Sequence, residues 1–445
     1  MYACNDRPIS AGARTGSAGR VPGEARRQES GLSAPARVDD NYVTAPASIV
    51  TLAAYGLLGN TAAIILPIIV GALMDTGLSA RVVGFAESAD MGGIALGALL
   101  WSRLILRVNW RLAAGCAIPV AVAGNLMCAL LPAIGPVIGG RFLSGFGSGL
   151  LAAIGSSGLA QTRRPERVYG LSSTANMMVA AGFVYAFTFI GHRQGSAAVF
   201  GGVACIIAVC TLGLKFLPTR SPEARRGVAE TRTETVARSA AIRWGPAGLM
   251  LAGIWAYFVA ALVFWTYAER VAVAAGFSTP FTARSLGFAQ IMGACGALST
   301  AVLASYFLRR LPSVVGYIAI AISAALLLTN HVQPWPFFAA VCMLSFSWSG
   351  IYPYFIGTVV ALDPTARLVS LTITISFIGK SMAPPIAGYL ARGTDYSLAY
   401  YFSAAFFLVC LALLLMPVLR ADRAMAARDF RPQTTSVAES GVVAP

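Results

Sequence analysis

Charged residues are scarce in this sequence: Asp, Glu, Lys and Arg make up 11% of its 445 residues, against about a quarter in an ordinary soluble domain. Hydrophobic residues make up 57% of the chain, and the mean hydropathy is +0.70. A chain of this composition has too few polar side chains to cover a water-facing surface, which excludes a soluble globular protein.

Metal-ligating and catalytic residues are also few. The sequence has two histidines, His192 and His331, and its eight cysteines include no Cys-x-x-Cys pair. Most of the cysteines stand inside apolar runs, where a small packing residue is the ordinary interpretation. We therefore predict no metal site and no cofactor. We also do not expect an enzyme, because such isolated residues assemble no nucleophile–base set.

The position of the positive charge excludes a role in binding nucleic acid. The formal net charge is +15, but the arginines stand in short polar pieces between apolar runs. They form no basic stripe interleaved with aromatic residues. Such a placement is typical of the residues that orient membrane spans.

Long apolar runs, by contrast, recur along the chain. About twenty apolar residues at a rise of 1.5 Å cross a hydrocarbon core of ~30 Å. We predict an all-α membrane protein with twelve transmembrane helices, at 48–74, 82–102, 112–133, 135–160, 168–190, 196–217, 247–269, 285–307, 313–330, 336–361, 368–390 and 399–419.

A polar, arginine-bearing segment separates these spans into two groups of six. We predict five parts: an N-terminal tail (1–46), a first six-helix bundle (47–217), a central loop (218–246), a second six-helix bundle (247–420) and a C-terminal tail (421–445). Both tails lack an apolar core, so we expect them to be disordered. The sequence leaves open whether the first is a real tail or an over-extended start.

The positive-inside rule orients the chain. When both tails and the central loop are placed on one side, about 26 of the 33 Lys and Arg fall on that side and five on the other. This predicts a multi-pass protein of the inner (cytoplasmic) membrane, surrounded by the lipid bilayer, with both termini in the cytoplasm.

An internal repeat relates the two groups of spans. SARVVGFAES at 79–88 matches TARSLGFAQI at 282–291, with Gly84 opposite Gly287 and Glu87 opposite Gln290. Each copy begins the second span of its group, so both cross the membrane in the same direction. Parallel repeats of this kind indicate a transporter whose substrate site lies where the two halves meet.

Three motifs resemble those of the major facilitator superfamily of secondary transporters. RFLSGFGSG from Arg141 to Gly149 resembles the family's R-x-x-Q-G-x-G, and RRPERVYG at 163–170 resembles its basic turn into the fifth span. LGN at 58–60 with LP at 66–67 is similar to a pattern of its drug-exporting branches. Together with the six-plus-six layout, the resemblance covers 47–420. It implies a monomer that carries a small-molecule substrate by alternating access between two bundles.

The sequence departs from the family in two places. The loop GALLWSRLILRVNWR at 97–111 keeps the basic charges of the family's G-x-x-x-D-R-x-G-R-R but lacks its Asp. Span five lacks the G-x-x-x-G-P-x-x-G-G element of drug/proton antiporters, which argues against a multidrug exporter. We predict a cytoplasmic gate formed by the basic residues Arg103, Arg107, Arg111, Arg167 and Arg367.

Ionisable residues inside the spans are the main candidates for function, because a charge within the bilayer is costly. Lys380 lies near the middle of its span, and Arg141 lies closer to an end; either cation could attract an anionic substrate. Glu87 and Asp90 share one helix face by their i, i+3 spacing. We predict that these two carboxyls take up and release the coupling proton.

Aromatic and amide side chains complete the predicted substrate site. Its members are Arg141, Lys380, Tyr55, Asn60, Tyr257, Trp265, Trp348 and Tyr352. For Asn176 we expect a hydrogen bond between helices. For Glu269 and Arg270, at the end of a span, we expect an exposed ion pair.

These features predict a secondary active transporter, coupled to protons by symport or antiport, for a small organic anion or an amphipathic carboxylate. Its alternative within transport is a proton-antiporting exporter of lipophilic compounds. A non-transporting membrane sensor and a polytopic enzyme are more distant alternatives.

Overall fold

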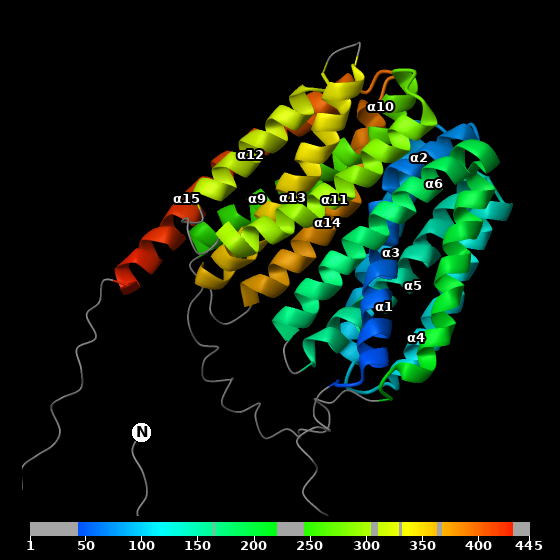
Figure 1. Ribbon diagram of the computed structural model, residues 1–445, viewed down its shortest axis with the longest axis horizontal. Helices are drawn as coiled ribbons and strands as arrows, with labels where there is room; N and C mark the ends of the chain where they lie inside the picture. The colour runs from blue at the N-terminus through cyan, green and yellow to red at the C-terminus, as the bar shows by residue number, and fades with distance from the viewer. Residues whose placement is uncertain are drawn as a thin grey trace, which may run out of the picture. The chain divides into compact units, whose positions relative to one another are not determined.

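The computed structural model describes residues 43–162, 165–219, 244–303, 310–328, 332–362 and 367–429. In this part of the chain, helices follow one another with short connections (Figure 1). Their bounds are α1 (Pro46–Ile64), α2 (Leu66–Asp75), α3 (Ala80–Leu104), α4 (Trp110–Leu130), α5 (Ile134–Ala160), α6 (Pro165–Val209), the 3₁₀ helix η2 (Cys210–Phe216), α9 (Trp244–Thr266), α10 (Ala268–Ala274), α11 (Thr279–Leu303), α12 (Arg310–Ala325), α13 (Pro334–Leu362), α14 (Arg367–Leu390) and α15 (Ser397–Asp429).

These helices account for twelve membrane-crossing segments within the described residues. By length and apolarity alone, seven helices qualify, and α1 with α2 adds an eighth as a bent pair. The other four crossings are α11, α12, α14 and the second half of α6, which a turn separates from the first half. Each crossing corresponds to one of the twelve spans predicted from the sequence.

Two breaks in the helices have identifiable causes. Between α1 and α2 the axis bends by 44°, next to Pro67, whose ring cannot continue the hydrogen-bond ladder of α1. Inside α6 the chain turns at Gly195, with φ 75° and ψ −171°. A side chain would strain this conformation, so glycine is needed there. Gly195 separates the fifth and sixth crossings, in agreement with the predicted gap at 191–195.

Two crossings end well beyond the predicted ends of their spans, and α11 begins at Thr279, before the predicted start at 285. The seventh crossing continues through α10 to Ala274, past the predicted end at 269, after a break at Tyr267. The last helix continues to Asp429, past the predicted end at 419. Its final residues, ADRAMAARD, are rich in Ala and Arg, which are good helix formers even where they are too polar to enter a membrane.

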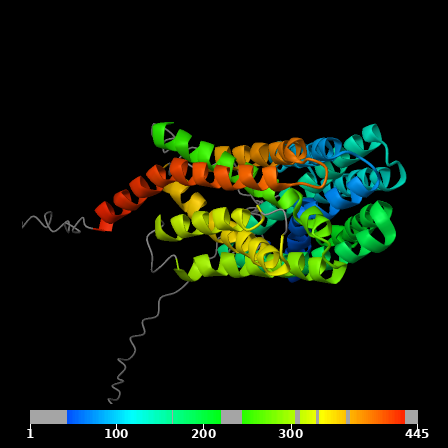
Figure 2. The same cartoon turned by 90° about the horizontal axis from the view of Figure 1, so that it is seen from above.

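Packing within each half follows the repeat. In the first half α3 packs along α5, and in the second half the corresponding α11 packs along α13. The halves meet where α3 contacts α14 and where α6 contacts α11 (Figures 1 and 2). Helix pairs from both halves therefore surround the region between them.

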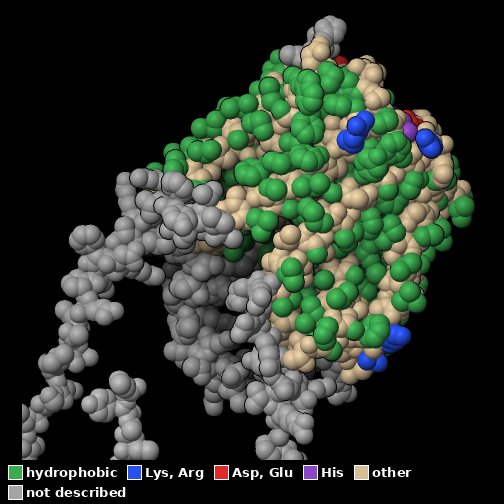
Figure 3. All heavy atoms as spheres, viewed as in Figure 1, with side chains coloured by type: hydrophobic (Ala, Val, Ile, Leu, Met, Phe, Trp, Pro, Cys, Tyr) green, Lys and Arg blue, Asp and Glu red, His purple; other side chains and the backbone are tan. Residues whose placement is uncertain are grey.

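The bundle has two ends, which we name after a residue at each. The Asp75 end carries the connections α2–α3, α4–α5, α10–α11 and α14–α15, together with the turn at Gly195. The Pro46 end carries the start of α1 and the connections α3–α4 and α5–α6. On the face drawn in Figure 3, hydrophobic side chains cover the zone between the two ends, and Lys and Arg appear only near the ends. This distribution is what a helical bundle in a bilayer requires.

Candidate functional site

A cavity of about 280 Å³ lies between the two halves. It is lined by α1 and α6 of the first half and by α9, α11, α13 and α14 of the second. The lining residues include the polar side chains Asn60, Ser173, Asn176, Gln290, Ser345, Ser349 and Lys380, and the aromatic side chains Trp265 and Trp348. A mostly apolar cavity with a few convergent polar groups is the usual form of a small-molecule site.

Lys380 is the one charged residue among those that line the cavity. It stands near the middle of α14, a helix of 24 residues. Its Nζ atom lies 4.8 Å from the ring centroid of Phe258 and 5.0 Å from that of Phe377. Within the described residues no carboxylate forms an ion pair with it. The two aromatic rings therefore hold the ammonium group by cation–π contact and leave it available to an anion in the cavity.

Amide side chains supply hydrogen-bonding groups on three sides of the cavity. Asn60 comes from α1, Asn176 from α6 and Gln290 from α11. Asn60 donates from Nδ2 to the carbonyl oxygen of Gly56 at 2.9 Å, which leaves its Oδ1 as an acceptor. The sequence predicts a hydrogen bond between helices for Asn176, but its place in the wall of the cavity gives it access to a ligand.

The two tryptophans are held in place by different contacts. Trp265 donates from Nε1 to the carbonyl oxygen of Ile64 at 3.3 Å, which links α9 to the end of α1. The Trp348 ring lies 5.7 Å from the ring of Phe258, and its own carbonyl oxygen accepts a hydrogen bond from the Tyr257 hydroxyl at 2.9 Å. Both indoles are thus fixed at the cavity wall.

Four of the eight predicted substrate-binding residues line the cavity: Asn60, Trp265, Trp348 and Lys380. The other four lie elsewhere. Tyr55 is buried and donates to the carbonyl oxygen of Cys210 at 3.0 Å, and Tyr257 is buried behind Trp348. Tyr352 packs its ring against Phe258, outside the lining set, and Arg141 is buried inside the first half.

Arg141 forms an ion triad with Glu87 and Asp90. Its Nη2 atom lies 2.9 Å from Glu87 Oε2 and 3.1 Å from Asp90 Oδ2, and none of the three side chains is more than 1% exposed. The ring centroid of Phe200 lies 5.8 Å from the guanidinium carbon of Arg141. Glu87 and Asp90, the two predicted proton-coupling residues, therefore contact Arg141, which the sequence predicts to be part of the substrate site.

Glycines make the triad possible by letting α3 and α5 approach closely. A Cβ atom on Gly145 would collide with the backbone of Asp90, and one on Gly93 would collide with the backbone of Phe142. These close approaches bring the two carboxyls on α3 to the guanidinium on α5 and exclude water from them.

The triad carries two carboxylates against one guanidinium. If all three groups were ionised, the buried site would hold one uncompensated negative charge, which is costly in a low-dielectric environment. Glu87 Oε1 and Asp90 Oδ1 have no hydrogen-bond partner within the described residues. Charge balance in the triad therefore favours one proton on the pair of carboxyls.

The repeat places different chemistry at matching positions of the two halves. Gln290 and Gly293, which match Glu87 and Asp90, line the cavity. The repeat has an offset of 203 residues, from Gly84 to Gly287, which matches Leu344 to Arg141. Leu344 also lines the cavity. At these positions the first half thus carries buried ionisable side chains, whereas the second half carries residues that line the cavity.

At the Asp75 end the two halves are in close contact. Gly84 of α3 lies against the backbone of Pro384 in α14, and Gly388 lies against Ala80. Tyr267 donates from its hydroxyl to the carbonyl oxygen of Ala80 at 3.3 Å. This structure therefore represents a conformation that is closed at the Asp75 end.

We predict that Gly84→Val opens this end. The added Cβ would come within 2.5 Å of the Pro384 carbonyl oxygen. Overpacking costs about 1–3 kcal/mol, so we expect the open fraction to rise about fivefold or more. Spin labels on Leu131→Cys and Thr394→Cys, one at this end of each half, should report a longer distance. Gly92→Val is the matched control, since no atom lies within 4 Å of its Cβ position. An unchanged distance distribution in Gly84→Val would contradict the assignment.

The predicted gating residues lie at the Pro46 end. Arg103, Arg107 and Arg111 are exposed there, and Arg111 donates from Nε to the carbonyl oxygen of Leu217 at 2.8 Å, a contact within the first half. The side chains of Arg167 and Arg367 lie outside the described residues. A gating role for this set stays a prediction.

Comparisons with known proteins agree with this fold. Residues 51–370 match the family model described as Major Facilitator Superfamily. Among solved structures, the chain is similar to a D-xylose-proton symporter (TM-score 0.67, 14% identity, 82% of this chain and 96% of that chain covered). It is also similar to the xylose transporter XylE from E. coli in a partially occluded inward open conformation (TM-score 0.63, 13% identity, 87% and 99% covered). A search of curated proteins finds no significant match.

Proposed function

The chain belongs to the Major Facilitator Superfamily and is a multi-pass secondary transporter rather than an enzyme, and from that premise we propose that it carries a small organic anion coupled to protons. The substrate class is an amphipathic carboxylate small enough for a cavity of about 280 Å³. Transport proceeds by alternating access, in which the two six-helix halves expose the cavity to one side of the membrane and then to the other.

The observation that carries this proposal is the position of Lys380. It is the charged member of the cavity wall, and its cation–π contacts with Phe258 and Phe377 leave its ammonium protons free for a ligand. A carboxylate in the cavity would replace the water that otherwise solvates this charge. A charge-assisted hydrogen bond of this kind is about twice as strong as a neutral one.

The rest of the cavity wall fits an amphipathic ligand. The indoles of Trp265 and Trp348 provide flat apolar surfaces, and the amides of Asn60, Asn176 and Gln290 can bind polar substituents. Among the lining residues there is no carboxylate, so a lipophilic cation has no partner there. The exporter of lipophilic cations is therefore the weaker alternative.

A neutral polyhydroxylated solute is a second candidate. Three amide side chains from three helices can donate to and accept from hydroxyl groups, and the similar solved structures are named as D-xylose-proton and xylose transporters. Charge distinguishes the two candidates, because a neutral solute gives Lys380 no counter-charge.

The proposal is tested first by binding. Thermal stabilisation of the purified protein should be measured with a panel of small carboxylates, the amide of each carboxylate and a set of sugars. Carboxylates are expected to stabilise the protein and their amides are not. Stabilisation by sugars alone would favour the second candidate.

For the coupling mechanism we propose that the triad binds the transported proton. In the conformation closed at the Asp75 end, Arg141 contacts both carboxyls and neither is exposed to water, so a proton bound there would be sealed in. Opening of this end would let water reach that proton. A proton drives the cycle only if it binds the two conformations with different affinities, and the sealing of the triad in one of them provides such a difference.

We predict that Glu87→Gln and Asp90→Asn uncouple transport from the pH gradient. In proteoliposomes, a gradient of one pH unit should change wild-type accumulation about tenfold for each coupled proton, and either variant should lose this response while retaining substrate exchange. Asp395→Asn removes a carboxyl outside the triad and serves as the control. A full gradient response in both triad variants would contradict the coupling role.

The orientation also belongs to the proposal. We propose, from the distribution of arginines, that the protein is a monomer of the inner membrane with the Pro46 end in the cytoplasm and the Asp75 end outside. The described conformation would then be closed to the outside.

A further inference from the structure

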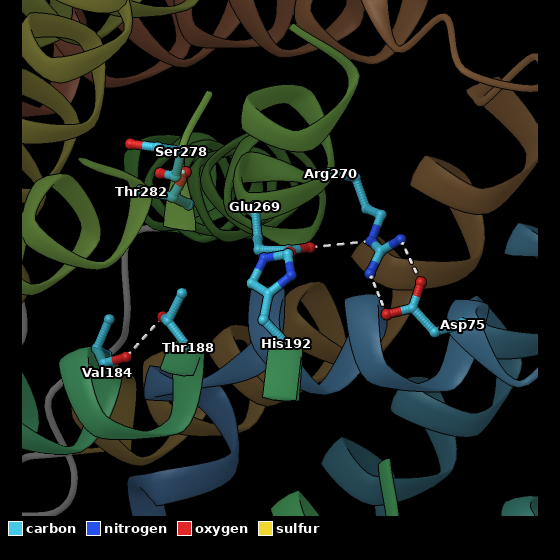
Figure 4. A network of polar contacts seen from close by, with 8 residues as sticks. All are labelled: Asp75, Val184, Thr188, His192, Glu269, Arg270, Ser278 and Thr282. Atoms are coloured by element: carbon cyan, nitrogen blue, oxygen red, sulfur yellow. Dashed lines mark hydrogen bonds and ion pairs between the residues drawn. The ribbon is translucent and has the colours of Figure 1, made fainter. Parts of the chain in front are cut away.

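A second group of ionisable residues lies at the Asp75 end, apart from the triad and the cavity (Figure 4). Arg270 binds Asp75 in a bidentate manner, with Nη1–Oδ1 at 2.8 Å and Nη2–Oδ2 at 3.0 Å. Its Nε atom donates to Glu269 Oε2 at 2.9 Å. His192 Nε2 lies 3.4 Å from the other oxygen, Oε1, of Glu269. Both carboxylate oxygens of Glu269 are therefore engaged, one by each of two basic side chains.

This group joins the two halves of the protein. Asp75 ends α2 and His192 belongs to α6, both in the first half, whereas Glu269 and Arg270 belong to α10 in the second half. We call these four residues the latch. The halves must separate here when the Asp75 end opens, so each contact between them has to break once in every transport cycle.

The latch corrects the sequence-based prediction of an exposed Glu269–Arg270 pair. The Glu269 side chain is 5% exposed and that of Arg270 is 12% exposed. The cause lies in α2, where a Cβ atom on Gly71 would collide with Glu269 and come within 2.7 Å of Arg270 Nη2. Glycine at this position makes room for both side chains against the first half, which the sequence of α10 alone does not reveal.

The charge of the latch depends on His192. Asp75 and Glu269 contribute two negative charges and Arg270 one positive charge, so the group carries one net negative charge when His192 is neutral and none when it is protonated. The largest effect on His192 is its hydrogen bond with Glu269, which raises the pKa of the imidazole above its usual value. Partial burial and the nearby Arg270 act in the opposite direction, and Asp75 adds to the increase.

Few other charged groups are near the latch in the described part of the chain. Tyr396, at the start of α15, interacts electrostatically with Arg270 and Glu269, and burial keeps it neutral by raising the pKa of its hydroxyl. On α6 itself the neighbouring Arg193 is exposed. From α2 the facing charge is Asp75, and from α10 the facing charges are Glu269 and Arg270.

We propose that His192 is a proton-binding site that fastens the two halves at the Asp75 end, so that a proton taken up there stabilises the closed conformation through Glu269. The site is separate from the triad, which lies within the first half alone. The inference rests on the proposed function only in that it assumes the two halves rock apart, and it requires neither a particular substrate nor coupling through the triad.

The direction of the pH effect follows from the sign of the shift. Because the closed conformation raises the pKa of His192, the proton binds this conformation more tightly than the open one. The stabilisation is fully present below the ordinary histidine pKa of about 6.5. The stabilisation is lost as the pH rises through the raised pKa of His192. The Asp75 end should therefore be more closed in acid and more open at alkaline pH.

The test measures this conformation directly in purified protein without substrate or gradient. Spin labels on Leu131→Cys and Thr394→Cys, in a background with the eight native cysteines replaced, report the separation of the halves by electron–electron distance measurement between about pH 5.5 and 8.5, on either side of the histidine pKa. In protein with an unmodified latch, we expect the fraction of molecules open at the Asp75 end to rise about two- to fivefold across this range, as for a partly exposed ion pair.

Two variants of His192 separate its charge from its shape. His192→Gln keeps a hydrogen-bond donor without titrating, and the open fraction should be high at every pH. His192→Lys keeps a positive charge through the range, and the open fraction should be low at every pH. His331→Gln, which removes the other histidine of the chain, should leave the pH response unchanged.

Retention of the full pH response in His192→Gln would overturn the proposal, and so would its loss in His331→Gln. If the response instead disappears in Glu87→Gln or Asp90→Asn and persists in His192→Gln, the triad senses pH and the latch does not. Because no substrate is present, a failure of the anion proposal would leave these results unaffected.

Discussion

Replacement of Lys380 by Gln is expected to lower the uptake of organic anions at least about 30-fold. Removal of one partner from a buried, hydrogen-bonded charge pair costs about 2 kcal/mol or more, and Lys380 is the charged member of the cavity wall. The measurement is the initial rate of carboxylate uptake into proteoliposomes at subsaturating substrate. Lys380→Arg keeps the positive charge and should retain part of the activity, although its planar head cannot reproduce every contact of an ammonium group.

The chain offers a matched control, because it contains one other lysine. Lys215 lies in η2 at the Pro46 end, exposed and over the ring of Phe216, and Lys215→Gln should transport anions at the wild-type rate. Carboxylate uptake that is unaffected in Lys380→Gln would remove the observation on which the proposed substrate class depends.

Replacement of Arg141 by Met is expected to destabilise the protein by about 3–5 kcal/mol. Breaking a buried ion pair by removal of one partner leaves an uncompensated buried charge, and this is among the most costly single changes. Here two carboxyls would remain, both buried and both already poorly hydrogen-bonded. The measurement is the midpoint of thermal unfolding in detergent, compared with that of wild type.

Neutralising the whole triad separates lost charge balance from lost packing. In Glu87→Gln/Asp90→Asn/Arg141→Met no buried carboxylate is left in the triad, so the midpoint should recover most of the loss seen in Arg141→Met. A triple variant as unstable as Arg141→Met would indicate that Arg141 stabilises the first half by its packing, for example against Phe200.

The layout of the fold could be predicted because it depends on local properties of the chain. Apolar length determines each crossing, and the predicted gap at 191–195 contains Gly195, where the chain turns, whereas the bend next to Pro67 falls inside a span predicted as continuous. The repeat of SARVVGFAES and TARSLGFAQI then predicts the parallel relation of α3 and α11, which the structure places in matching packing with α5 and α13.

The candidate site could be predicted only in part, because the direction of a side chain depends on its neighbours. Lys380 and Arg141 are both cations in apolar spans, yet Lys380 faces the cavity and Arg141 faces two carboxyls. The i, i+3 spacing places Glu87 and Asp90 on one face but does not say which helix that face meets. The close approach of α5, through Gly145, decides it.

Gln290 illustrates a signal that the sequence does carry. As the neutral counterpart of Glu87 in the repeat, it marks a position that points toward another helix or a cavity. In the second half no arginine stands at the position of Arg141, so Gln290 is left to line the cavity. The latch, by contrast, leaves no signal in any one segment, since its four residues come from three helices and depend on space at Gly71.

We propose that charge on the substrate, recognised by Lys380, decides what this transporter carries. This proposal is tested most directly by comparing, in the same proteoliposomes, the uptake of carboxylates with the uptake of their amides, in wild type and in Lys380→Gln. Wild type is expected to transport the carboxylates and not the amides, and Lys380→Gln is expected to lose this preference. Equal uptake of each carboxylate and its amide by wild type would contradict the proposal.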